Sequence, residues 1–283
     1  MSGQNSPSWA ALVGRQHTEI GQLATSAEGS TAIALSCGGA AKTYGHTDPN
    51  EDAVCFARGS GGILVAVADG HHGSSGSEAV MDHIASHLAQ DWTGADDLGF
   101  DDQSWKECSL EVLHDLGRAV LGHAARLGVA PAPTTLCLGL IRPGESALGW
   151  ICMGDSHLFR ADESGVEDLG WARAKRKDRF FLGYEAASRE GMRDRSVAGY
   201  EALGGTRALA LATDGLSEHK IGVADPAGAV SAALEASQAA PFETRSLALA
   251  SQLSRIAMEA HVNNRAGDNI GCAVVDLRPE EPS

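Results

Sequence analysis

The sequence predicts an α+β protein built in layers. Hydrophobic residues make up 43% of the 283 positions, which is enough for a sizeable core. There are 34 glycines and only 5% aromatic residues, which favours closely packed strands and many turns over a bundle of long helices. No linker divides the chain. We therefore expect a single domain over residues 29–278, a loosely ordered lead-in at residues 1–28 and a tail at residues 279–283.

Several apolar runs predict strands, because runs rich in Val, Leu and Ile without alternation are typical of strands buried on both faces. The central run is ILVAVADGHHG, in which the apolar segment ends at Asp69-Gly70. A second run, ALALATDG, also ends in Asp-Gly, at Asp214. The remaining predicted strands lie at residues 31–37 and 53–57, in a meander over residues 133–165, and at the end of the chain in NIGCAVVDL.

Helical periodicity appears between these runs. We expect helices over residues 75–92, 104–127, 226–238 and 242–262. Ser75 and Glu78 have the spacing of a capping box at the first helix. Residues 171–206 open with a basic cluster and predict a loop or small flap. Two interpretations of the cluster stay open: a solvated basic face, or a lid that attracts phosphate.

Charge and hydropathy limit the partners. The formal net charge of −15 argues against nucleic acid or an anionic membrane as the main partner, because both repel an acidic surface. No apolar run approaches the roughly 20 residues of a membrane span, and the amino terminus does not resemble a signal peptide. We expect a cytoplasmic protein. The oligomeric state does not follow from the sequence, and a monomer is the favoured expectation.

The six cysteines exclude one class of chemistry. They lie far apart, without a Cys-x-x-Cys pair, so we expect buried, reduced thiols. No cysteine is followed by five residues and an arginine, so the thiolate-nucleophile phosphatase arrangement is absent.

Acidic residues recur where predicted strands meet turns. Each Asp-Gly alone is adequately explained as a turn. As a set, such acids would repel one another unless cations neutralised them, so they predict bound divalent metal. Two ions about 4 Å apart would hold a bridging hydroxide and clamp phosphoryl oxygens. The acids are Glu51, Asp52, Asp69, Asp155, Asp214 and Asp268.

Six short motifs then occur in a specific order across residues 45–277: NEDAV, VADGHHG, PTTL, MGDSH, LATDGL and GDNI. Together they resemble the successive motifs of the metal-dependent serine/threonine protein phosphatases of type 2C. The resemblance implies a four-layer α-β-β-α sandwich, in which helices flank two antiparallel sheets. It also implies two Mn²⁺ or Mg²⁺ ions in a cleft at one end of the sandwich, with a weaker third site.

The resemblance assigns roles by position. The implied metal ligands are Asp52, Asp69 as the bridge between both ions, the carbonyl of Gly70, Asp214, Asp268, and Asp155 at the third site. Glu51 would act directly or through water. His71 matches the histidine that would protonate the leaving alkoxide, a role that suits a side chain titrating near neutrality.

One departure concerns phosphate binding. Family members usually carry an arginine four residues before the glutamate of the first motif, and this chain has Thr47 there. His157 likewise stands where arginine is common. We hypothesise that His46, Lys42 or the basic cluster at residues 173–179 replaces the missing cation.

The resemblance implies an enzyme that hydrolyses phosphoserine and phosphothreonine on protein substrates by attack of a hydroxide held between two ions. Such an enzyme would oppose a serine/threonine kinase. Two alternatives stay open. In the first, the chain is a regulatory module of the same fold that has lost turnover, as Thr47 would allow. In the second, it is a metal-dependent hydrolase of small phosphoesters. Retention of all six acids speaks against the regulatory module.

Overall fold

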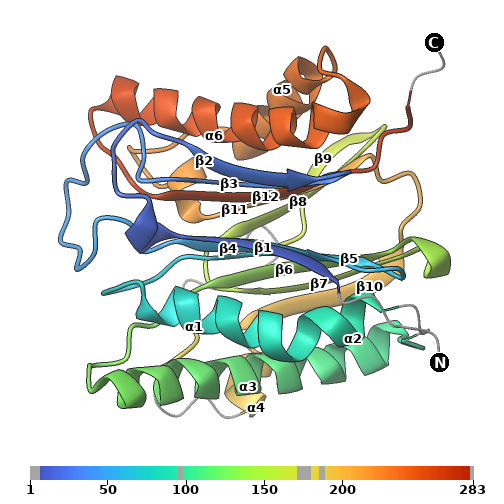
Figure 1. Ribbon diagram of the computed structural model, residues 1–283, viewed down its shortest axis with the longest axis horizontal. Helices are drawn as coiled ribbons and strands as arrows, with labels where there is room; N and C mark the ends of the chain where they lie inside the picture. Colours follow the sequence, from blue (N-terminus) through green and yellow to red (C-terminus); the bar gives the residue numbers. More distant parts are fainter. Residues whose placement is uncertain (1–6, 95–97, 171–179, 185–188, 281–283) are drawn as a thin grey trace.

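The computed structural model describes residues 7–94, 98–170, 180–184 and 189–280. It has four layers, in which two antiparallel sheets lie face to face and helices cover both outer surfaces (Figure 1). This is the α+β sandwich of two antiparallel sheets that the sequence motifs predict. Among the described residues, no helix combines the length and the hydrophobicity needed to cross a membrane.

Each sheet has six strands. The first runs in the order β1 (Ser8–Val13), β4 (Ala53–Arg58), β5 (Ile63–Ala68), β6 (Leu136–Arg142), β7 (Ala147–Met153) and β10 (Ser196–Ala202). The second runs in the order β2 (Ala24–Glu28), β3 (Thr31–Ser36), β12 (Ile270–Asp276), β11 (Ala208–Ala212), β8 (His157–Asp162) and β9 (Gly165–Asp168).

Helices pack on the two outer faces. The first sheet is covered by α1 (Ser75–His83), a π-helical turn at Ile84–Leu88, α2 (Ala89–Thr93), α3 (Asp102–Leu127) and α4 (Arg189–Arg193). The second sheet is covered by α5 (Pro226–Ser237) and α6 (Arg245–Asn264). Short 3-10 turns lie at Gly14–Gln16, Pro143–Glu145, Asp214–Leu216 and Phe242–Thr244.

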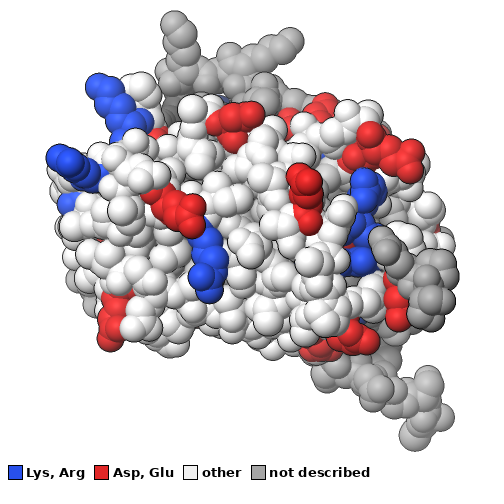
Figure 2. Space-filling model, turned by 90° about the horizontal axis from the view of Figure 1, so that it is seen from above, with Lys and Arg blue, Asp and Glu red and all other residues white. Residues whose placement is uncertain are grey.

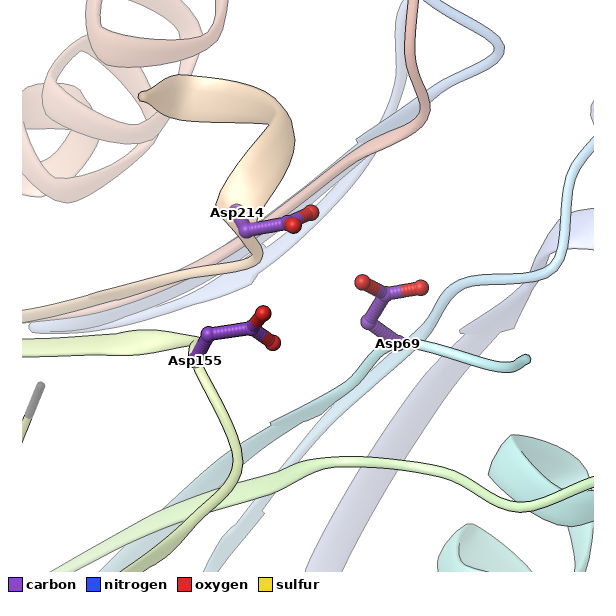
Figure 3. A group of neighbouring side chains, drawn as sticks. All are labelled: Asp69, Asp155 and Asp214. Carbon is purple, nitrogen blue, oxygen red and sulfur yellow. The ribbon is translucent and has the colours of Figure 1, made fainter. Parts of the chain in front are cut away.

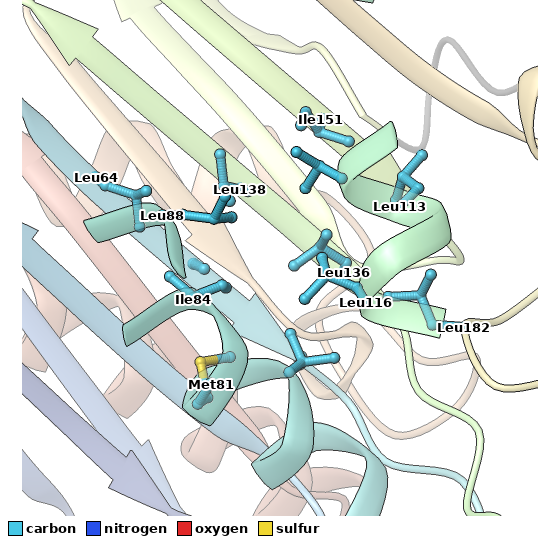
Figure 4. Packing of buried hydrophobic residues seen from close by; sticks show 14 of the residues in the cluster. Leu64, Met81, Ile84, Leu88, Leu113, Leu116, Leu136, Leu138, Ile151 and Leu182 are labelled. Atoms are coloured by element: carbon cyan, nitrogen blue, oxygen red, sulfur yellow. The ribbon is translucent and has the colours of Figure 1, made fainter. Parts of the chain in front are cut away.

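Apolar side chains fill the space between the sheets and beneath each helical layer. Ile33, Val65 and Leu209 belong to the cluster between the sheets, and none of them is exposed. A second cluster joins α1 and α3 to the first sheet (Figure 4). Trp105 is fully buried there, and its indole N–H donates to the carbonyl of Trp150. Burial of this apolar surface is the main force that holds the layers together.

The outer face of α5 and α6 carries isolated charges. Figure 2 shows this face, on which acidic and basic side chains are scattered among other residues. The described residues visible there form no continuous basic surface.

Antiparallel pairing brings several connections to one end of the sandwich. The first residue of β4, Ala53, pairs with the last residue of β5, Ala68. In the second sheet, Ala212 at the end of β11 pairs with His157 at the start of β8. Because neighbouring strands run in opposite directions, the end of one strand lies beside the start of the next. The segments that carry the predicted metal ligands therefore leave the sheets at the same end.

Two edge strands lie within the stretch for which the sequence predicts a loosely ordered lead-in. β1 pairs with β4, and β2 pairs with β3. These strands are only partly buried. An edge strand is fixed by backbone hydrogen bonds to one neighbouring strand, and polar side chains do not prevent this pairing. The weak hydrophobic pattern of residues 1–28 therefore did not indicate β1 and β2.

The first helix also differs from expectation. Its N-cap is Ser74, whose side chain makes no capping hydrogen bond, so the predicted capping box at Ser75 and Glu78 is wrong. A capping box does occur at α3, where the Asp101 side chain accepts from the Ser104 backbone N–H. The predicted helix over residues 75–92 is interrupted by the π-helical turn. Within the predicted flap, α4 and β10 are described, and the basic cluster at residues 173–179 lies outside the described residues.

Leu209→Ala is expected to lower the free energy of unfolding by about 2–5 kcal/mol, because it leaves a cavity between the sheets. Urea denaturation followed by circular dichroism measures this loss. Leu127→Ala is the matched control, since Leu127 is 58% exposed at the end of α3 and its truncation should change the free energy by within about 0.5 kcal/mol. Equal effects of the two substitutions would contradict the placement of the core.

Candidate metal centre

Three carboxylates converge at the shared end of the two sheets. Asp69 follows β5, Asp155 follows β7, and Asp214 begins the 3-10 turn after β11. Each offers an oxygen within 4.8 Å of an oxygen of the other two. Figure 3 shows the three side chains pointing toward one another from separate segments. Residues 145 positions apart in the chain thus meet in one group, with one ligand from the second sheet's β11 and two from the first sheet.

The Asp69 segment is fixed through its backbone. The Asp69 N–H donates to the Thr135 hydroxyl at 2.9 Å, and its carbonyl accepts from the Thr134 hydroxyl at 2.8 Å. The next residue must be glycine for reasons of space. A Cβ on Gly70 would lie 2.6 Å from the carbonyl oxygens of Glu51 and Gly73. Close backbone approach therefore explains Gly70, whose φ is not positive.

Asp52 joins the two sheets beside this group. It precedes β4 and is only 1% exposed. The Thr213 hydroxyl, which lies between β11 and Asp214, donates to Asp52 Oδ2 at 2.7 Å. The same hydroxyl oxygen accepts from the Gly271 N–H at 2.8 Å. A Cβ on Gly271 would lie 2.7 Å from Val54 Cγ1, so the sheets are closely apposed at this point.

Glu51 and Asp268 are held on the adjacent side by Asn269. The Glu51 N–H donates to Asn269 Oδ1 at 2.9 Å, and Asn269 Nδ2 donates to the carbonyl of Pro49. Both acids are nearly buried, at 4% and 7% exposure. Glu51 Oε1 accepts from the Thr47 N–H at 3.1 Å, so the residue at the family's arginine position contributes a backbone donor to a predicted ligand.

A lysine and a tyrosine also contact these two acids. Lys42 Nζ lies 3.6 Å from Glu51 Oε2 and 3.7 Å from Asp268 Oδ1, and the lysine side chain is 5% exposed. The Tyr44 hydroxyl donates to Asp268 Oδ1. The sequence offered Lys42 as a substitute for the missing phosphate-binding arginine. In the structure it is paired with carboxylates and shielded from solvent, which disfavours that role.

The acids strongly perturb one another. Burial, followed by the charges of Asp52, Asp268 and Asp155, raises the pKa of Asp69 well above its usual value. Burial and the charges of Asp69 and Asp268 likewise raise the pKa of Asp214. Burial raises the pKa of Asp52 to about 8, although the hydrogen bond from Thr213 opposes this shift. The ionised cluster therefore needs cations or protons to balance it.

The donor set fits a hard divalent cation. Carboxylate and backbone carbonyl oxygens are the ligands that Mg²⁺ and Mn²⁺ prefer, and the described residues of this group contribute no thiolate or imidazole. Mutual repulsion of buried carboxylates supplies the driving force for binding a cation. The residues present thus fit the ions that the sequence motifs imply.

The two predicted histidines lie at the rim of the centre. The backbone N–H of His71 donates to the carbonyl of Pro133 at 2.7 Å. The centroid of the His71 ring lies 4.2 Å from the centroid of the Phe181 ring. His71 directly follows the Asp69-Gly70 segment. His46 is exposed, and its Nδ1 lies 3.1 Å from the carbonyl oxygen of Tyr44.

Sequence reasoning missed a second network, which joins the Asp155 and Asp214 segments. His157 Nδ1 lies 2.7 Å from Asp168 Oδ2, and His157 Nε2 lies 2.6 Å from Ser217 Oγ. His157 is only 3% exposed. The arrangement resembles a Ser-His-Asp triad, but its histidine is buried, so we interpret it as a clasp between the two ligand-bearing segments. The replacement of arginine by His157 was its only signal in the sequence.

Comparison with known proteins agrees with the motifs. The profile of the family described as Protein phosphatase 2C matches residues 41–259. This range includes every predicted ligand except Asp268. The chain therefore belongs to the protein phosphatase 2C family. No curated protein sequence matches the chain.

Solved structures share the fold at low sequence identity. The serine-threonine phosphatase 2C from Toxoplasma gondii is 18% identical, with a TM-score of 0.64, and the match covers 95% of this chain and 99% of that one. The Mycobacterium tuberculosis phosphatase PstP/Ppp is 19% identical, with a TM-score of 0.57, covering 91% and 99%. A PstP catalytic domain in complex with 2 manganese ions is 20% identical, with a TM-score of 0.58, covering 91% and 100%.

The pKa shifts predict how pH affects the metal-free protein. The ordinary aspartate pKa is 3.8, and that of folded Asp52 is about 8. A raised folded-state pKa means that the folded protein binds protons more tightly than the unfolded chain. The resulting stability is present below about pH 4 and is lost as the pH rises through about 8. Mn²⁺ should replace the lost protons, so its stabilising effect should grow with pH.

Thermal denaturation with chelator and with excess Mn²⁺ tests this expectation. At pH 8, Mn²⁺ should raise the Tm by about 5 °C or more, and the rise should be clearly smaller at pH 5.5. Asp69→Asn should reduce the rise, whereas Asp115→Asn, which removes an exposed carboxylate on α3, should not. A rise that is independent of pH would contradict the raised pKa values.

Proposed function

We propose that the protein is a metal-dependent phosphatase that hydrolyses phosphoserine and phosphothreonine on protein substrates. The observation that carries the proposal is the meeting of Asp69, Asp155 and Asp214, three buried or partly buried carboxylates from separate segments with oxygens within 4.8 Å. Membership of the protein phosphatase 2C family supports the reaction class. A cluster that has raised pKa values and lies at the rim of a fold is also typical of a functional site.

Each acid has a proposed part in holding the ions. Asp69, the carbonyl of Gly70, Asp214 and Asp268 would bind the catalytic pair, Asp155 would contribute to a third site, and Asp52 and Glu51 would support them from the β4 side. Mn²⁺ or Mg²⁺ bound there would supply an activated water and neutralise phosphoryl oxygens. The chain itself fixes the ligands: Thr135 orients Asp69, and Thr213 orients Asp52.

We propose His71 as the acid that protonates the leaving alkoxide. It directly follows the Asp69-Gly70 segment and is held by the hydrogen bond from its N–H to Pro133. The contact with Phe181 restricts the orientation of its ring. An imidazole can deliver a proton near neutral pH, and a serine alkoxide requires one to leave.

A groove beside the centre supports a protein substrate over a small phosphoester. It encloses about 580 Å³ and extends from Thr47 and Gly73 to Val129, beyond the end of α3. Arg15 and His123 lie on its wall together with several carboxylates. A groove of this size can accommodate residues that flank a phosphorylated side chain. His46, exposed next to Thr47, is the described candidate that remains for binding phosphate.

The proposal extends to the setting of the protein. The substrate would be phosphorylated by an opposing serine/threonine kinase, in the cytoplasm, and the phosphatase would act as a monomer. The alternative is a regulatory module without turnover. It is suggested by Thr47, which stands where family members usually carry a phosphate-binding arginine. It predicts metal binding without hydrolysis, so measurement of turnover decides between the two.

Mn²⁺-dependent hydrolysis of p-nitrophenyl phosphate is the first test. The protein should release phosphate with Mn²⁺ and lose turnover with chelator. Asp69→Asn should lower kcat by about a hundredfold or more, because it removes a proposed bridging ligand. Asp115→Asn should leave kcat unchanged.

Turnover that survives chelation or the Asp69→Asn substitution would contradict the metal-dependent mechanism. A phosphoserine peptide compared with free phosphoserine then tests the substrate class. A higher kcat/KM for the peptide is expected if the groove binds flanking residues, and equal values would favour a small phosphoester.

His71→Asn should affect substrates according to their leaving group. With a phosphoserine peptide, kcat should fall by about a hundredfold or more, because the alkoxide loses its proton donor. With p-nitrophenyl phosphate the loss should be much smaller, since nitrophenolate leaves without protonation. His87→Asn is the matched control, because His87 is an exposed histidine that does not line the groove. Equal losses on both substrates would exclude the proposed acid role.

A further inference from the structure

His261 is a buried polar side chain for which neither the sequence motifs nor the proposed mechanism gives a role. It lies in the last turn of α6, one of the helices that cover the second sheet (Figure 1). The residue is 0% exposed. A buried imidazole has two polar nitrogens that require hydrogen-bond partners, so the partners of His261 indicate what it does.

The first partner lies next to a predicted metal ligand. His261 Nε2 is 2.8 Å from the carbonyl oxygen of Gly215. A carbonyl oxygen can only accept, so Nε2 carries the proton and donates it. Gly215 directly follows Asp214 in the 3-10 turn after β11. The imidazole therefore holds the turn that presents the Asp214 carboxylate.

The other ring nitrogen contacts a second predicted ligand. His261 Nδ1 accepts from the backbone N–H of Gly39 at 3.3 Å and from that of Asp268 at 3.4 Å. These two bonds are longer than the bond to Gly215, because both donors share one lone pair. The same side chain thus joins the backbone of Asp268 to the Asp214 turn.

The backbone segments around the imidazole are in direct contact with one another. A Cβ on Gly215 would lie 1.8 Å from the carbonyl oxygen of Asn269, and a Cβ on Gly38 would lie 2.1 Å from that of Asp268. Gly38 also has a φ of 97°, which glycine adopts most readily. Because no space separates these segments, displacement of one must displace its neighbour.

The hydrogen bonds require a neutral imidazole, since a protonated ring has no acceptor at Nδ1. Burial lowers the pKa of His261, although the hydrogen bond to Gly215 and the charge of Asp268 oppose this shift. A neutral ring adds no positive charge beside the carboxylates, so it orients their segments without competing with a divalent ion.

We infer that His261 is a positioning residue of the metal centre, which sets the separation between the Asp214 turn and the Asp268 segment. The inference rests on the proposed metal-dependent function, in which both acids bind the catalytic ions. Both ring nitrogens are engaged by the backbone, so His261 acts through the ligand-bearing segments and not as a ligand. Substitution of residues that orient metal ligands typically lowers metal affinity by about 10–100-fold.

His261→Leu tests the inference, because leucine occupies much of the same space and makes none of the hydrogen bonds. Titration of metal-free protein with MnCl₂, followed by the electron paramagnetic resonance signal of free Mn²⁺, gives the affinity for the ions without requiring turnover. At least one ion should bind about 10–100-fold more weakly than it does to the unaltered chain. Circular dichroism before titration establishes that the variant is folded.

Two conservative variants divide the role of the ring between its nitrogens. His261→Gln places an amide donor near the position of Nε2 and should retain the bond to Gly215. His261→Asn places an acceptor near the position of Nδ1 and should retain the bonds from Gly39 and Asp268. Each should bind Mn²⁺ more weakly than the unaltered chain and more tightly than His261→Leu. They also decide the question if His261→Leu does not fold.

Leu253→Ala is the matched control for lost stability. Leu253 lies two turns earlier on α6, is 1% exposed and belongs to the apolar cluster beneath that helix. Its truncation leaves a cavity and should lower the Tm, as the His261 substitutions should. Because Leu253 is remote from the hydrogen bonds of His261, the affinity for Mn²⁺ should change by less than about threefold.

The outcomes distinguish this inference from the proposed function. If the unaltered chain binds Mn²⁺ and the folded His261 variants bind it equally well, the role of His261 is overturned and the metal-dependent function stands. If Leu253→Ala weakens binding as much as the His261 substitutions, loss of stability is the cause and the positioning role is overturned. If the unaltered chain does not bind Mn²⁺, both proposals fail.

Discussion

Repulsion among buried carboxylates is the constraint on which the rest of the structure depends. Asp69, Asp155 and Asp214 are brought together at a place where water screens their charges poorly, and Asp52 and Asp268 add to the repulsion. A folded chain accepts this arrangement only if its hydrophobic core provides enough stability and if cations or protons balance the charge. The large apolar layers are therefore needed for the acidic rim, because burial of apolar surface offsets the repulsion among the carboxylates.

The sandwich provides rigid attachment points for these acids. Each ligand-bearing segment leaves a buried strand, and each is fixed by a neutral hydrogen-bonding side chain nearby. Thr135 holds the Asp69 backbone, Thr213 joins Asp52 to the second sheet, and Asn269 connects Glu51 to the start of β12. Neutral donors and acceptors orient the carboxylates without contributing a net charge that would compete with a metal ion.

The distribution of positive charge separates this chain from the usual pattern of its family. The position that commonly carries a phosphate-binding arginine is Thr47, whose backbone N–H donates to Glu51. A cation is present a few residues earlier, at Lys42, and it contacts the metal-binding acids. This lysine therefore lies against two predicted metal-binding acids, whereas Thr47 supplies no positive charge.

The sequence by itself predicted most of the strands, most of the helices and the identity of the acidic residues, because long apolar runs and Asp-Gly strand ends are local patterns. The edge strands β1, β2 and β10 were not predicted, since their stability comes from backbone pairing with β4, β3 and β7. Only the tertiary structure decided that Asp69, Asp155 and Asp214 form the closest group, and that His157 joins Asp168 and Ser217. It also decided that Lys42 faces Glu51 and Asp268. These relations depend on the distance between segments far apart in the chain, which residue spacing does not encode.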